Sequence, residues 1–301
     1  MAQGLGGILA AALTPFDRRS KPHHARFVAH CTHLLENGCD GINVLGTTGE
    51  ANSIALADRW DLMEAVASSD LPMNAMMVGT GAPAVDDAIR LTKHAQACGF
   101  AGALVLPPFY YKNVSDDGLF AFVARLIERA DLRRTKIYLY NFPAMTSLWY
   151  SVELIERLVR EFPGVVVGVK DSANDRGYQH ALRERLPGFA VFPGSEAYIA
   201  EARREGCTGC ISATVNVTAR EAQAAWSAGD ADYKEKQARI AWLRSTIAAY
   251  PAIPAVKAVK SRFERNDKWE RMLPPLVPLR IDEKEKLFTA LADWLAEPAP
   301  V

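Results

Sequence analysis

The sequence predicts an α/β fold, a single (β/α)8 TIM barrel followed by a C-terminal helical appendage. Short apolar runs alternate along most of the chain with longer amphipathic runs, which is the pattern of parallel strands joined by crossover helices. The apolar runs number eight, and no Ser/Gly-rich linker separates them. One closed barrel therefore accounts for all of them.

The eight expected strands are short and rich in aliphatic residues, as buried parallel strands are. They are ILAAAL (8–13), GINVLG (41–46), NAMMVG (74–79), GALVLP (102–107), KIYLYN (136–141), VVVGVK (165–170), FAVFPG (189–194) and GCISAT (209–214). The helices expected between them include residues 24–38, 57–69, 86–99, 117–130 and 152–162, several of which end at a glycine suited to a helix C-cap.

The last part of the chain has a different pattern, because it contains helical periodicity without any strand between the helices. Segments containing Pro251, Pro254 and Pro274-Pro275 are expected to separate these helices. We therefore divide the chain into a barrel over residues 1–218 and a helical extension over residues 219–301 that packs on the barrel.

Composition and charge favour a small-molecule partner. The 301 residues include 35 basic and 35 acidic side chains, so no net positive field recruits nucleic acid or an anionic membrane. No apolar run approaches the roughly 18 residues of a membrane span. Five scattered cysteines are typical of reduced thiols rather than of a disulfide scaffold. We expect a cytoplasmic protein that contacts neither membrane nor nucleic acid.

In a barrel of this type the active site lies at the C-terminal ends of the strands. The sixth expected strand ends at Lys170, and period-two alternation places Val166, Gly168 and Lys170 on one face. If this face points inward, Gly168 leaves room for the lysine stem, and the amine could attack a carbonyl group. The alternative is a lysine at a strand end that extends into solvent.

Two neighbouring strand ends carry further candidates. Tyr138 and Tyr140 share a face of the fifth strand, and a tyrosine hydroxyl near a reactive lysine can transfer protons, although either ring could simply belong to the core. The segment Gly46-Thr47-Thr48-Gly49-Glu50 follows the second strand. Its backbone N–H groups could converge on an anion such as a carboxylate, or the segment could be an ordinary turn.

Together these motifs resemble a known family. G-T-T-G-E at 46–50, Y-N-F-P at 140–143 and G-V-K-D at 168–171 are similar to the signatures of the pyruvate-dependent class I aldolases, the N-acetylneuraminate lyase and dihydrodipicolinate synthase family. The resemblance extends through ALTPF (12–16), PPFYYKN (107–113), GSE (194–196) and PPLVPL (274–279). It implies a carbon–carbon lyase that acts on pyruvate and a 2-keto-3-deoxy acid. No metal or cofactor is expected, because a protonated imine is itself the electron sink.

The resemblance also implies a role for each catalytic residue. Lys170 would form the Schiff base, Tyr140 would be the acid/base tyrosine, and Thr47 would be the hydrogen-bond partner of Tyr140. Tyr111 would reach the site of a neighbouring subunit across a tight dimer interface, so a homo-oligomer, a dimer of dimers, is expected. Glu50 is interpreted as structural.

The substrate contacts implied by the resemblance are more diverse. Thr48, with the N–H groups of Thr48 and Gly49, would hold the carboxylate, and further contacts fall to Met145, Ser195, Glu196 and Ile211. Dihydrodipicolinate synthases generally have arginine at the position of Met145, and a thioether cannot replace a bidentate guanidinium. This favours the branch of the lyases and 2-keto-3-deoxy-sugar-acid aldolases. Dihydrodipicolinate synthase, a keto-deoxy sugar acid dehydratase and an inactive keto-acid sensor stay open as alternatives.

Overall fold

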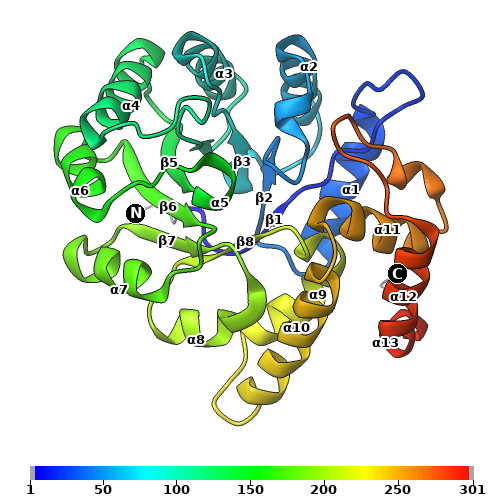
Figure 1. Cartoon of the computed structure of the whole chain (residues 1–301). Coiled ribbons are helices and arrows are strands. Elements are labelled where there is room, and N and C mark those ends of the chain that lie inside the picture. The colour runs from blue at the N-terminus through cyan, green and yellow to red at the C-terminus, as the bar shows by residue number, and fades with distance from the viewer. Residues whose placement is uncertain (1–3, 298–301) are drawn as a thin grey trace.

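Eight parallel strands form a barrel at the centre of the computed structural model, which describes residues 4–297 (Figure 1). The strands are β1 (Gly7–Ala11), β2 (Gly41–Val44), β3 (Met76–Gly79), β4 (Gly102–Val105), β5 (Lys136–Asn141), β6 (Val166–Asp171), β7 (Ala190–Pro193) and β8 (Gly209–Ser212). Their order is β7-β6-β5-β4-β3-β2-β1-β8. The backbone N–H of Thr208, just before β8, donates to Val191 of β7 at 3.0 Å and brings the two ends of the sheet together. The predicted fold class is confirmed.

Helices surround the barrel. Those that follow the first seven strands are α1 (His24–Glu36), α2 (Leu56–Ala67), α3 (Val85–Ala97), α4 (Asp116–Ala130), α5 (Pro143–Thr146), α6 (Val152–Glu161), α7 (Arg176–Arg185) and α8 (Ile199–Arg204). The five helices bounded from the sequence lie within two residues of α1, α2, α3, α4 and α6. Between residues 4 and 297, no helix combines the length and the apolar character that crossing a membrane requires.

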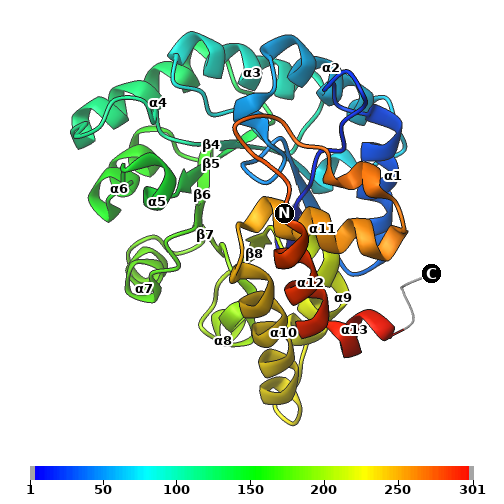
Figure 2. The same ribbon diagram turned by 45° about the vertical axis from the view of Figure 1, so that its right-hand side comes forward.

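The chain after β8 is helical, as predicted, and the expected boundary at 218/219 lies within a helix. It falls inside α9 (Val215–Trp226), at Thr218, where the backbone is non-helical. Ala219, Ala222 and Ala225 pack in the same core as the α1 and α2 side chains, so α9 belongs to the barrel wall. The extension then comprises α10 (Tyr233–Ala248), α11 (Ala252–Glu264), α12 (Ile281–Ala290) and α13 (Ala292–Ala296), which Figure 2 shows on the side of α1 and α9.

The barrel interior is a separate apolar layer. It contains Leu9, Ala11, Met77, Leu104, Tyr138, Tyr140, Phe192 and Ile211, which come from six of the eight strands. Alternate residues of the same strands, such as Ile8 and Ala10 of β1, face outward and pack with the helices. This alternation aims the inward side chains at the strand ends toward the mouth of the barrel.

A bulge in β6 overturns one expected detail. Ile137 pairs with Val166, but Tyr138 pairs with Gly168, so one residue of β6 is unmatched. As a result Val166 packs with Val169 in the outer layer and does not share a face with Lys170. Gly168 is required for a different reason from the one expected: a Cβ there would lie 2.8 Å from the ring of Tyr138.

Candidate active site

Lys170 and Tyr140 lie side by side at the C-terminal ends of β6 and β5. The two residues are register partners on adjacent parallel strands, so the backbone fixes their spacing. Lys170 is 5% exposed and Tyr140 is 3% exposed. Nζ of Lys170 donates to the Tyr140 hydroxyl at 3.3 Å and lies 4.4 Å from the ring centroid. A buried amine within reach of a proton-transfer group is the arrangement that attack on a carbonyl requires.

The tyrosine below this pair is not suited to proton transfer. Tyr138 shares the interior face with Tyr140, as predicted, and packs edge to face on Phe192. Burial raises the pKa of Tyr138 to about 12, against an opposing hydrogen bond from the Leu5 backbone. Its hydroxyl lies toward the N-terminal end of the barrel, 3.8 Å from the position a Cβ at Gly4 would take. Tyr138 is therefore a core residue.

The Gly46–Glu50 loop forms the wall opposite Tyr140. Thr47 is half-buried and lines a cavity of about 10 Å³ together with Gly46 and Tyr140. Thr48 is buried. Thr14, from the segment after β1, donates its hydroxyl to the Gly49 carbonyl at 2.7 Å. A Cβ at Gly49 would approach the Ala12 carbonyl to 3.0 Å, so a glycine is needed for this close packing.

Glu50 anchors the loop to the C-terminal extension. Its backbone is left-handed, with φ 58°, and its fully buried carboxylate bonds to Nζ of Lys257 on α11. The Leu273 N–H donates to the second carboxylate oxygen at 2.7 Å. Burial raises the pKa of Glu50, and Lys257 opposes that rise. The structural interpretation of Glu50 agrees with these contacts, which reach beyond its own turn.

Asp171 holds the strand end that carries Lys170, a role the sequence reasoning missed. Its carboxylate is fully buried and accepts hydrogen bonds from Asn141 (3.0 Å), Gln179 (2.8 Å) and the N–H groups of Ala173 and Asp175 (both 3.0 Å). Burial raises the pKa of Asp171, and the bonds from Gln179 and Asn141 act against this rise. The sequence feature that could have indicated this role is an aspartate directly after Lys170, at the end of an apolar strand.

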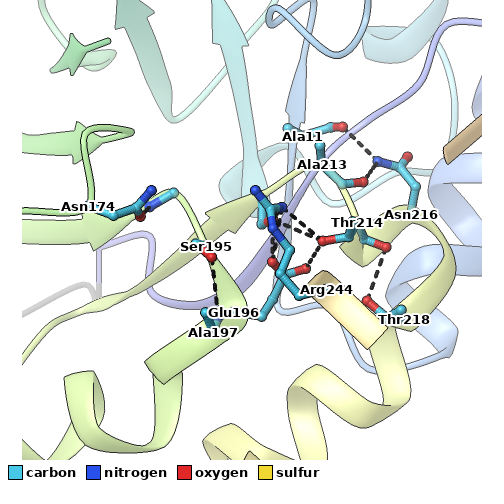
Figure 3. Close-up of polar contacts among 12 residues, drawn as sticks. Ala11, Asn174, Ser195, Glu196, Ala197, Ala213, Thr214, Asn216, Thr218 and Arg244 are labelled. Carbon is cyan, nitrogen blue, oxygen red and sulfur yellow. Dashed lines mark hydrogen bonds and ion pairs between the residues drawn. The ribbon is translucent and has the colours of Figure 1, made fainter. Parts of the chain in front are cut away.

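The residues after β7 that were expected to contact substrate, Ser195 and Glu196, have hydrogen-bond partners within the chain. Ser195 caps the following turn by accepting from the Ala197 N–H at 3.3 Å. Glu196 is fully buried, and its carboxylate accepts from Ser212 at 2.6 Å, from Thr214 at 2.5 Å and from Arg244 at 3.3 Å (Figure 3). With its oxygens engaged in this way, Glu196 joins β7, β8 and α10. These contacts give Glu196 a structural role, and its expected contact with substrate stays a prediction.

Comparison with known proteins decides the family. Residues 4–293 match the Dihydrodipicolinate synthetase family. The chain belongs to this family. It is 30% identical to an uncharacterized DapA-like lyase of Chloroflexus aurantiacus, over 98% of both chains. It is 31% identical to an N-acetylneuraminate lyase of Rhizobium meliloti, over 70% of this chain and 69% of the relative.

Solved structures agree with this assignment. The crystal structure of dihydrodipicolinate synthase from Agrobacterium tumefaciens superimposes with a TM-score of 0.88 at 31% identity, over 97% of this chain and 99% of that one. This member of the dihydrodipicolinate synthetase family is therefore an aldolase-type lyase.

Of the remaining residues to which the resemblance gives a role, one is buried in the barrel and two are exposed. Ile211 lies in the barrel interior in the same apolar cluster as Tyr140. Met145, on α5, is 65% exposed, and Tyr111, on the segment after β4, is 74% exposed. The fold thus brings Lys170, Tyr140 and Ile211 together. It leaves Tyr111 at the surface of its own chain.

Proposed function

We propose that this enzyme cleaves or forms the carbon–carbon bond of a 2-keto-3-deoxy acid, with pyruvate as one product or donor. The observation that carries the proposal is the buried pair at the strand ends, in which the amine of Lys170 lies 3.3 Å from the hydroxyl of Tyr140. Membership of the dihydrodipicolinate synthetase family supports it.

The proposed reaction begins when the neutral amine of Lys170 adds to the keto carbon of the substrate. The carbinolamine then loses water and leaves a protonated imine. In the cleavage direction, the hydroxyl on C4 gives up its proton, the bond between C3 and C4 breaks with its electron pair moving toward the imine nitrogen, and the aldehyde departs. The proton released from the C4 hydroxyl balances the one that the enamine takes up next. The remaining enamine takes up a proton at C3, and hydrolysis of the imine releases pyruvate. This chemistry calls for no cofactor and no metal ion.

Each neighbouring group has a part in this scheme. The Tyr140 hydroxyl is close enough to move the protons of the carbinolamine and imine steps. Gly46 and Thr47 of the Gly46–Glu50 loop line the small cavity together with Tyr140, and Thr47 is the proposed hydrogen-bond partner of Tyr140. Thr48, with the N–H groups of Thr48 and Gly49, is the proposed partner of the substrate carboxylate. The exposed Tyr111 is proposed to complete the site of a second subunit, within a homo-oligomer built as a dimer of dimers. All five cysteines are free thiols, in keeping with a cytoplasmic enzyme.

A second candidate is dihydrodipicolinate synthase activity, which the similarity to the Agrobacterium enzyme supports. Met145 argues against it, because the thioether offers no charge-assisted hydrogen bond to a second carboxylate. Dehydration of a keto-deoxy sugar acid would use the same enamine.

Borohydride trapping tests the nucleophile. Pyruvate plus borohydride should add one reduced pyruvyl group to the protein, and peptide mass spectrometry should locate it on Lys170. Lys170→Ala should abolish the mass shift. Lys112→Ala is the matched control, because Lys112 is exposed and donates to the Thr146 carbonyl at 3.0 Å beside the mouth. A mass shift that persists in Lys170→Ala would show that the proposed nucleophile is wrong.

A further inference from the structure

The side chain of Asn43 lies inside the barrel, beneath the Gly46–Glu50 loop. Asn43 is the third residue of β2, and its neighbours Ile42 and Val44 face the outer helices. Alternation therefore turns Asn43 inward. The amide rises toward the loop, because a Cβ at Gly46 would lie 2.5 Å from Nδ2 of Asn43. Gly46 is thus needed to make room for this amide.

The amide of Asn43 is fully buried, and neither of its polar atoms has a hydrogen-bond partner among the described residues. Its β-sheet neighbours on this level are Ala11 and Met77, whose side chains cannot donate or accept strongly. A buried amide without partners opposes folding. An unpaired group of this kind in a folded protein calls for an explanation by a ligand or an ordered water.

The surroundings indicate which ligand this is. Gly46, which touches the Asn43 amide, lines the small cavity together with Thr47 and Tyr140. Tyr140 in turn is bonded to Lys170. The amide therefore reaches the underside of the loop proposed to hold the substrate carboxylate. An N–H donor there is suited to an anion.

We propose that Asn43 is a further binding residue of this enzyme, which donates a hydrogen bond to the carboxylate of the bound 2-keto acid. This inference rests on the proposed function and extends it, because it adds a donor from inside the barrel to those of the loop. In the free enzyme the unpaired amide of Asn43 then lowers the stability of the fold, and in the complex it binds the substrate.

Asn43→Leu tests the proposal, because leucine has nearly the same shape and lacks the amide. Two quantities are measured: the melting temperature without ligand, and the pyruvate concentration that gives half-maximal borohydride trapping on Lys170. We expect the melting temperature to rise and the half-saturating concentration to rise about tenfold or more, as for the loss of one hydrogen bond to a charged group. Met77→Leu is the matched control, since Met77 is the register partner of Asn43 and carries no amide.

Asn43→Asp is the second variant, which keeps the size of the side chain and removes the N–H donor from its ionised form. It should also weaken trapping, and more strongly as the pH is raised, because an ionised carboxylate repels the substrate carboxylate. If the wild type is trapped and both variants keep its half-saturating concentration, Asn43 is not a substrate ligand and its amide is satisfied by water alone. If the wild type is not trapped at all, the proposed function and this inference both fail.

Discussion

Two buried lysines show what distinguishes a reactive amine from a structural one. Lys257 is fully buried, and burial lowers its pKa, but the Glu50 carboxylate beside it favours the charged form. Lys170 is nearly as buried, yet its hydrogen-bond partner is the hydroxyl group of Tyr140 rather than a carboxylate. An ammonium paired with a carboxylate cannot attack a carbonyl group. The partner, rather than burial alone, therefore supports Lys170 over Lys257 as the proposed nucleophile.

Met145 is the residue proposed to decide which second carboxylate the enzyme accepts. Condensation of pyruvate with aspartate semialdehyde should be poor in the wild type, because a charged group that lacks its bidentate partner loses roughly 1.5–3 kcal/mol, or about 10–150-fold. Cleavage of a neutral-tailed 2-keto-3-deoxy sugar acid should be readily detected in a coupled pyruvate assay. Met145→Arg should improve the condensation, whereas Met145→Leu should not. Efficient condensation by the wild type would contradict this assignment and would mean that another arginine binds the carboxylate.

At the scale of elements, α11 holds the Gly46–Glu50 loop through a single buried ion pair. Lys257→Met should reduce the free energy of unfolding by about 3–5 kcal/mol, because it leaves the Glu50 carboxylate buried without its cation. Urea unfolding measures this loss. Adding Glu50→Gln to Lys257→Met should restore much of it, since the uncompensated charge is then gone.

Lys284→Met is the matched control for that experiment. Lys284 pairs with Glu270 at 2.8 Å between α12 and the preceding turn, and both side chains keep some exposure. Its loss should cost about 1 kcal/mol or less. If Lys257→Met costs no more than Lys284→Met, the buried pair does not hold the loop.

The sequence predicts the elements well and the contacts between them poorly. Every expected strand lies within two residues of an observed one, because apolar runs and their turn residues are local signals. The bulge in β6 depends on the pairing of Val166 with Ile137 and on the ring of Tyr138, which no local pattern contains. Likewise, the partners that make Glu196 structural include Arg244, which lies 48 residues further along the chain. The motifs place Lys170 at a strand end, but only the fold shows its hydrogen bond to Tyr140.

At the scale of the whole molecule, the C-terminal extension contacts the barrel at the end where Lys170 and Tyr140 lie. The extension has its own core, in which Trp269 and Trp294 pack with Leu13 from the segment after β1. Through Glu50 and Leu273 it also holds the loop beside Tyr140. The extension therefore helps to position the Gly46–Glu50 loop and is not a separable module. The family match accordingly includes most of it, up to residue 293.

Tyr111 is 74% exposed in the single chain, and its ring packs edge to face against that of Tyr110, with ring centroids 5.3 Å apart. If Tyr111 completes a neighbouring site, light scattering should find an oligomer, and Tyr111→Phe should lose activity without changing its mass. Each inactive variant, Tyr111→Phe and Lys170→Ala, would then carry the residue that the other lacks. Dissociating the two variants and reassembling them together should restore part of the activity, because mixed dimers contain one site with both residues intact. Self-mixing of either variant is the control. A fully active monomer, or a mixture no more active than its components, would mean that each chain works alone.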